Sequence, residues 1–409
     1  MAPNDSAETT SEATGTVAGR RKAARYIVPF AVAGVAAATI GLVPALADSG
    51  DPELPKITAQ ELIEKIAASD QQQLSGTLKV TADLGLPSIG GLAGSFAPGG
   101  TGAGEGDSAA DPQAKLMELT SGTHTLRVAA DGPDKQRLSI LGDAAEYSLI
   151  HNAGEVWAYD SQSDEAYHAK SDTSKAGKHE KAPKGVPATP DALAEEALKA
   201  AGDTTSVTVD GTAQVAGRDA YRLLIKPKQS GSTIGSVTIA VDAKNGVPLK
   251  FTLAPSGGGK AVIDAGFTKV DFGKPDASSF TFTPPKGAKV TEAEDLAAEA
   301  EKNGKADRLP EELGALEGFQ GLDVIGEGWT SVAALEVPGG AGLPTQGAEG
   351  VPAEAQQFLD ALGDRVTGTF GSGTVFKTRL VNALMTDDGK VYVGAVTKDA
   401  LVRAADTAK

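Results

Sequence analysis

Residues 236–253 read SVTIAVDAKNGVPLKFTL, and this stretch decides the fold. Every second residue from Val237 to Val241 is apolar, which is the period of a strand with one buried face. Asn245-Gly246 follows and is typical of a two-residue turn that needs positive φ. The β pattern then resumes up to Leu253, so the stretch predicts a hairpin with one apolar face.

Similar patterns lie on both sides of this hairpin. Tyr221 to Ile225 and Val262 to Phe272 flank it, so at least four strands follow one another with short links. Such a series predicts a meandering antiparallel sheet. Further strands are expected at 74–84, 123–128, 137–141, 147–151 and 156–159.

Two amphipathic helices are expected beside the sheet. Thr58 and Glu61 form a capping box, and apolar residues then recur at helical spacing up to Asp70. Thr189 caps a second helix that begins at Pro190 and runs through Ala201. Both helices present an apolar face to a partner surface.

A Gly-rich stretch, 85–111, separates two of the predicted strands and carries four apolar residues in its first half. A plain linker rarely carries such residues. The stretch is either a mobile flap over an apolar surface or a surface loop, and the sequence favours neither.

Length and composition exclude several classes of function. A chain of 409 residues indicates two folded units. A net charge of −16 argues against nucleic-acid binding and against broad adsorption to anionic lipid heads. The absence of cysteine excludes disulfides, Cys-ligated zinc and a thiol nucleophile.

The N-terminal residues indicate the compartment. Residues 1–25 are a polar tail that ends in basic residues and is expected to stay in the cytoplasm. Residues 26–47 carry no charge and end in an A-x-A pattern, so they are either a signal peptide cut after Ala47 or a transmembrane anchor. In both cases the rest of the chain is extracytoplasmic, secreted or anchored to the cell membrane.

Composition divides the exported chain into three parts. Residues 48–290 form a mainly β domain, and residues 291–323 a charged, Ala-rich helical linker. Residues 324–409 form a small α+β domain, with a strand from Trp329, a helix over 352–362 and a hairpin around 386–389.

Catalysis finds little support in the sequence. The histidines, His124, His151, His168 and His179, are scattered and form no metal-binding pair. No G-x-S-x-G elbow occurs, so nothing marks the nucleophile that a secreted hydrolase would need. The sequence therefore predicts no catalytic residue, no metal site, no cofactor and no enzyme.

Three segments carry a resemblance to a known family. Residues 215–221 (VAGRDAY), 241–249 (VDAKNGVPL) and 280–287 (FTFTPPKG) resemble the closing strands of the periplasmic lipoprotein carrier family LolA. They also resemble the related RseB proteins and the mycobacterial LppX and LprG proteins. Residues 122–128 (GTHTLRV) resemble actinobacterial members of this superfamily.

The resemblance implies a mainly β (α+β) fold, in which an unclosed antiparallel β half-barrel holds lid helices and an apolar cavity on its concave side. LolA has a functional arginine just before a proline, whereas the matching residues 130–133 contain none. The resemblance therefore implies that this protein binds lipid, but it does not imply that the protein delivers a lipoprotein to an acceptor. The residues expected to line the cavity are Leu78, Val80, Leu126, Val128, Leu223, Ile225, Val237, Ile239, Val241, Leu249, Phe251 and Leu253.

The apolar pattern and the resemblance together lead to two hypotheses. The first is a non-catalytic, extracytoplasmic carrier whose partner is an acylated lipid or lipoprotein. The alternative is an RseB-like envelope-stress sensor that regulates an anti-sigma factor or another membrane partner. A filled core without a cavity remains possible for the same residues.

Overall fold

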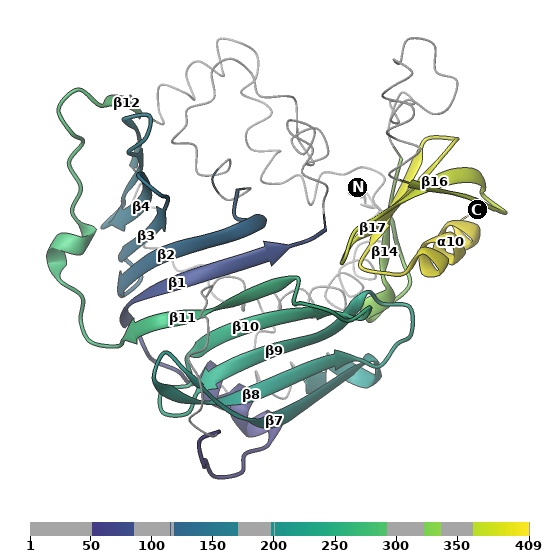
Figure 1. The fold of residues 1–409 in the computed structure, drawn as a ribbon, viewed down its shortest axis with the longest axis horizontal. Coiled ribbons are helices and arrows are strands. Elements are labelled where there is room, and N and C mark those ends of the chain that lie inside the picture. The colour runs from purple at the N-terminus through teal and green to yellow at the C-terminus, as the bar shows by residue number, and fades with distance from the viewer. Residues whose placement is uncertain are drawn as a thin grey trace, which may run out of the picture.

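The computed structural model describes residues 51–85, 115, 118–170, 198–199, 201–292, 323–336 and 363–408 (Figure 1). Over these residues the fold is mainly β, with one large unclosed sheet and a second, smaller sheet. Helices α2 (Ala59–Ala67) and α10 (Lys398–Thr407) accompany the two sheets. The predicted fold class is confirmed.

The large sheet has twelve strands in the order β12-β6-β5-β4-β3-β2-β1-β11-β10-β9-β8-β7. Two antiparallel meanders are joined by β1, which lies between β2 and β11. The bounds are β1 (Gln73–Asp83), β2 (Ser121–Asp131), β3 (Lys135–Leu141), β4 (Glu146–Asn152), β5 (Glu155–Asp160), β6 (Glu165–Lys170), β7 (Thr205–Val215), β8 (Arg218–Pro227), β9 (Ile234–Asp242), β10 (Pro248–Pro255), β11 (Ile263–Asp271) and β12 (Lys289–Glu292).

The large sheet is mixed rather than wholly antiparallel. Its last strand, β12, pairs in parallel with β6, with Lys289 opposite Glu165 and Glu292 opposite His168. The sheet curls strongly, and β7 and β12 lie at opposite ends of it (Figure 1). Because these two edges do not meet, the barrel is open.

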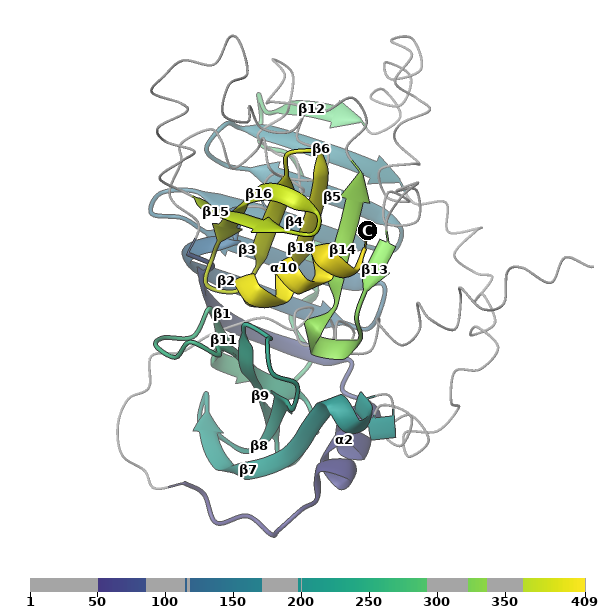
Figure 2. The same ribbon diagram turned by 90° about the vertical axis from the view of Figure 1, so that its right-hand side faces the viewer.

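Helix α2 forms where the capping box predicts it. The backbone N–H of Glu61 donates to Thr58 Oγ1 at 3.2 Å, and the backbone N–H of Thr58 donates to Glu61 Oε2 at 2.7 Å. The helix ends at Ala67, three residues earlier than expected. It lies beside β7 and β8 (Figure 2), with Leu62 fully buried.

The link between β9 and β10 differs from the expected two-residue turn. Of its residues only Gly246 has positive φ, at 73°, and the carboxylate of Asp242 accepts the backbone N–H groups of Lys244 and Asn245. Burial would raise the pKa of Asp242, but hydrogen bonds from Arg218 and from these N–H groups lower it below its ordinary 3.8. The turn is therefore held by a buried carboxylate.

Residues 280–287 are not a closing strand. Phe280 ends the short 3-10 helix η3 (Ala277–Phe280), and residues 281–287 run as an irregular segment up to β12 (Figure 1). Phe280 is buried, and Arg137 of β3 donates to the carbonyl oxygen of Ser279 at 3.4 Å. Proline at 284 and 285 prevents ladder pairing there. We call residues 277–287 the strap.

The smaller sheet has six antiparallel strands in the order β13-β14-β18-β17-β16-β15, and α10 packs on it. Its hairpin around 386–389 is confirmed. Trp329 was wrongly expected in a strand; it lies in the 3-10 helix η5 (Gly328–Thr330). The strand bounds are β13 (Asp323–Ile325), β14 (Val332–Glu336), β15 (Gly363–Gly368), β16 (Gly371–Lys377), β17 (Asn382–Thr386) and β18 (Lys390–Gly394).

Several expected segments lie outside the described residues. These are the N-terminal 1–47, most of 85–111, the linker after Glu292 and the helix over 352–362. Of the helix expected at 190–201, only 198, 199 and 201 are described, and these are helical. Among the described helices, none has the length and apolar character needed to span a membrane. The domain boundaries stay predictions.

Replacing Asp242 with Asn should lower the free energy of unfolding by about 1–3 kcal/mol, because Arg218 loses a buried charged acceptor. A lowered carboxyl pKa stabilises the fold at neutral pH, and that contribution is lost as pH falls through the folded-state pKa, below 3.8. The variant should therefore lose less stability than the wild type between neutral pH and about pH 3.

Urea unfolding at several pH values measures this effect. Asp219→Asn, on the exposed side of the neighbouring strand, is the matched control and should leave the free energy of unfolding almost unchanged. Equal pH profiles for the wild type and Asp242→Asn would contradict the assignment.

Candidate functional site

The apolar side of the large sheet faces α2, and all twelve expected lining residues lie on buried or half-buried strand positions. They divide between two adjoining clusters. The first cluster contains Leu223, Ile225, Val237, Ile239, Val241, Phe251 and Leu253. The second contains Leu78, Val80, Leu126 and Leu249, with Val128 packed against it.

Strand pairing aligns most of these residues on one concave face. Leu223 lies opposite Ile239, and Ile239 lies opposite Phe251. The row continues through Ala265 to Val80. Cross-strand partners project to the same side of a sheet, so the apolar row crosses five strands without a break.

A second row crosses the other half of the sheet. Leu78 lies opposite Leu126, which lies opposite Ile140, which lies opposite Tyr147. A third row runs from Val128 through Leu138 and Leu149 to Ala158. The concave face is therefore apolar from β8 to β5.

The pairing register between β9 and β10 shifts at Leu249. Pro248 pairs with Val241 and Lys250 pairs with Ala240, so Leu249 is the extra residue of a β-bulge. It packs in the second cluster with Ala220 and Ala240, apart from its strand neighbours Phe251 and Leu253. Burial still alternates along β10, so the sequence pattern does not reveal the bulge.

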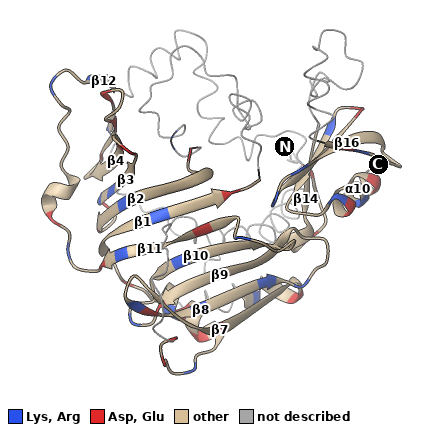
Figure 3. Cartoon of the chain, in the orientation of Figure 1, with Lys and Arg blue, Asp and Glu red and all other residues tan. Residues whose placement is uncertain are grey.

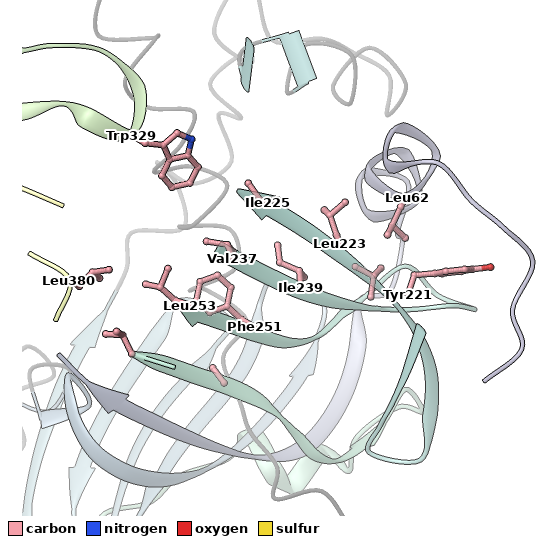
Figure 4. Packing of buried hydrophobic residues seen from close by; sticks show 13 residues of the cluster. Leu62, Tyr221, Leu223, Ile225, Val237, Ile239, Phe251, Leu253, Trp329 and Leu380 are labelled. Carbon is pink, nitrogen blue, oxygen red and sulfur yellow. The ribbon is translucent and has the colours of Figure 1, made fainter. Parts of the chain in front are cut away.

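Three elements cover the first cluster. Leu62 of α2 lies over β8, while Trp329 and Leu380 reach it from the C-terminal unit (Figure 4). Leu62 follows from the predicted amphipathic helix. The contributions of Trp329 and Leu380 have no local sequence signal, because Trp329 is held at Thr205, 124 residues away, and Leu380 at Thr233, 147 residues away.

The half of the concave face on β2–β5 has a different border. Val128, Leu138 and Leu149 are only half-buried, whereas Ala158 is fully buried. Lys115 pairs with Asp160 at 3.1 Å and lies 5.9 Å from the ring centre of Tyr147. Burial lowers the pKa of Lys115, but the bond to Asp160 and the charges of Asp160 and Glu118 outweigh it and raise that pKa.

Histidine chemistry is not assembled among the described residues. His124 Nε2 donates to the carbonyl oxygen of Ser121, at 2.6 Å. His168 stacks on Trp157, with ring centres 3.9 Å apart, and binds Glu292 at 2.8 Å through Nδ1. No group of three His, Asp or Glu residues in the described ranges could hold a metal ion. What the concave face can do is bind apolar groups.

The C-terminal sheet is fastened to the rim of the half-barrel. Trp329 Nε1 donates to Thr205 Oγ1 at 2.7 Å, and the side chain of Gln229 accepts the backbone N–H of Trp329 at 3.0 Å. Arg379 binds Asp83 at 2.5 Å and also donates to the carbonyl oxygen of Lys260. We call these contacts the junction.

Comparison with known proteins gives no match to a protein-family model and no match to a curated protein. Similar solved structures include the MucA/MucB complex of Pseudomonas aeruginosa, at 15% identity over 85% of this chain and 96% of that chain, with a TM-score of 0.38. A LolA superfamily protein from Nitrosomonas europaea matches at 10% identity over 56% of this chain and 99% of that chain, with a TM-score of 0.21.

These identities and TM-scores describe a likeness of fold only. They show similarity to MucB and to a LolA superfamily protein, and they assign neither a family nor a role to this chain. The actinobacterial part of the sequence resemblance receives no support from these matches.

Trp329→Ala should destabilise the junction by about 3–5 kcal/mol, because it removes a buried aromatic ring. Trp329→Phe keeps most of the ring and should cost about 1 kcal/mol, through the lost bond to Thr205. Thermal unfolding followed by the fluorescence of Trp157 measures both. If the Ala and Phe variants unfold alike, the ring of Trp329 does not hold the junction.

Proposed function

We propose that this protein binds an acylated lipid or lipoprotein on its concave face, outside the cytoplasmic membrane and without catalysis. The observation that carries the proposal is the unbroken apolar row from Leu223 to Val80, together with its continuation across β2–β5. The export segment predicted at 26–47 supports the compartment.

The energetics require a surface of this kind. Removing an acyl chain from a membrane costs about 0.8 kcal/mol per CH₂, so roughly 10 kcal/mol for a long chain. A concave surface of aliphatic side chains offsets that cost by shielding the chain from water. The rows of Leu, Ile and Val on β1–β11 supply such a surface.

The half-buried side chains indicate where a ligand would lie. Helix α2 packs over β7 and β8, whereas β2–β5 lie at the other side of β1 in the sheet. Val128, Leu138 and Leu149 keep part of their apolar surface exposed there. We place the acyl chain along these residues, beside Lys115.

Val128→Gln should weaken binding of an acylated fluorescent probe by about tenfold, because it puts a polar amide into the apolar row. Val290→Gln makes the same change at a side chain that is 40% exposed on β12, and it should leave the affinity unchanged. Fluorescence titration of residues 48–409 measures the affinity, and native mass spectrometry of protein from membranes detects a co-purified lipid.

The titration and the mass spectrum each test the proposal. Equal loss in the two variants, or no binding of the acylated probe by the wild type, would contradict an acyl site on the concave face. If the wild-type protein is folded and carries no lipid, the sensor hypothesis is favoured.

The second candidate function is an RseB-like sensor that binds a membrane protein partner. The observation in its favour is the junction, because Trp329 and Leu380 pack in the same cluster as Ile225 and Val237 of the concave face. A ligand that extends from β2–β5 to this half of the concave face would therefore contact residues that hold the C-terminal sheet. One solved MucB structure contains MucA as its bound partner. For this chain we expect the partner to be a protein of the cell membrane.

Hydrogen exchange tests this coupling. Addition of an acylated ligand should change amide protection in the junction residues 323–336 and 378–382, because their core contacts are shared with the ligand face. The turn at 387–389, in which Asp387 and Asp388 are exposed, serves as an internal control and should exchange unchanged. Protection that changes only on β1–β5 would oppose a sensor role.

A further inference from the structure

The outer face of the same sheet carries a group of cations. Lys269 of β11 lies opposite Thr77 of β1, and Thr77 lies opposite Arg127 of β2. Lys79 follows two residues along β1, so it projects to the same side as Thr77. Their neighbours Leu78 and Leu126 point to the concave face, so these three cations lie on the convex face.

The three cations are not neutralised within the described part of the chain. Arg127 and Lys269 are exposed, Lys79 is half-buried, and no ion pair is formed there by any of them. Figure 3 shows basic positions in blue crossing β3, β2, β1, β11 and β10. In a chain of net charge −16, an unpaired basic group of this kind is a local exception. We call Lys79, Arg127 and Lys269 the basic patch.

The border of the basic patch is polar and partly neutralised. Lys250 pairs with Asp264 at 3.0 Å on one side, and Arg137 pairs with Glu146 at 3.1 Å on the other. The hydroxyls of Thr81 and Thr123 bond each other at 3.0 Å. The strap contacts β3 and β4 through η3, and Arg127 and Lys269 are exposed. The patch therefore offers charge and hydroxyl groups to a partner, with few apolar contacts.

We propose that the basic patch is a docking surface for an acidic, extended segment of a protein partner. Complementary charge is the argument, since positive groups steer and orient a negative partner. A bilayer is disfavoured as the partner, because the net charge of −16 repels an anionic surface and three cations attract it by only about 3 kcal/mol. The polar border also provides no apolar anchor.

The spacing of the basic patch suits an extended peptide. Neighbouring strands lie about 4.8 Å apart, so Lys269 and Arg127, two strands apart, are separated by about 10 Å. An extended chain advances about 3.3 Å per residue and turns every second side chain to the same side, so carboxylates two or four residues apart lie about 7 or 13 Å apart on one face, within reach of the long Lys and Arg side chains. Lys79 lies two residues after Thr77 on β1, so it can pair with a further carboxylate of the peptide.

Fluorescence anisotropy with a labelled peptide of alternating Glu and Ser tests the proposal, and the same peptide with Lys in place of Glu is the probe control. The triple variant Lys79→Glu, Arg127→Glu, Lys269→Glu should weaken binding of the Glu peptide about tenfold or more. The matched variant Lys56→Glu, Lys244→Glu, Lys286→Glu changes three exposed lysines elsewhere by the same charge and should stay within about twofold of the wild type.

Salt and vesicles complete the experiment. Binding should weaken as sodium chloride rises, because the contacts are exposed ion pairs. Equal affinity of both triple variants, or no binding of the Glu peptide by the wild type, would overturn the proposal. Vesicle binding that depends on the three cations in the absence of peptide binding would assign the patch to anionic lipid and overturn it too. The acyl-probe titration is run in parallel. A negative result with the Glu peptide therefore does not decide whether the concave face binds an acyl chain.

Discussion

The burial of Leu62 against the concave face is the contact on which the large sheet depends. An unclosed sheet exposes one apolar side, and covering that side with a helix removes it from water. The capping box starts α2 at Thr58, and its other end meets the β9–β10 turn. A Cβ atom on Gly246 would lie 2.3 Å from the carbonyl oxygen of Lys65, so only glycine permits this approach. Helix, turn and sheet thereby set one another's positions.

The two faces of the same sheet have different chemistry because side chains alternate along each strand. The concave face collects Leu, Ile, Val and Phe, while the convex face carries Lys, Arg and Thr. An acyl ligand and an acidic partner, as proposed, would therefore occupy opposite sides of β1 and β2. Leu78 and Lys79 are adjacent in the chain, so the two proposed sites lie on opposite faces of the same strand, β1. Neither ligand would block the other.

Much of the fold was predictable because its signals are local. Alternation identified the strands from β1 to β5 and from β8 to β11, and the pair Thr58 and Glu61 identified α2. The expected lining residue Leu249 is buried in phase with Phe251 and Leu253, but the bulge at this position was not predicted, since it changes the pairing register and not the alternation. Residues 280–287 were expected to be a closing strand only because of the family resemblance, and the prolines at 284 and 285 forbid pairing there. Helix α10 was missed, since its apolar face rests on one leucine and small alanines.

The sequence by itself determined the periodicity of each strand, the capped start of α2, the overall charge and the absence of cysteine chemistry. The tertiary structure alone decided that β1 separates the two meanders, that β12 adds in parallel and that Trp329 joins the two sheets. It also brought Lys269 beside Arg127 across β1. The physical reason is range. Alternation and capping act over a few residues, whereas strand order and the junction depend on contacts between residues more than 100 positions apart, which no local pattern encodes.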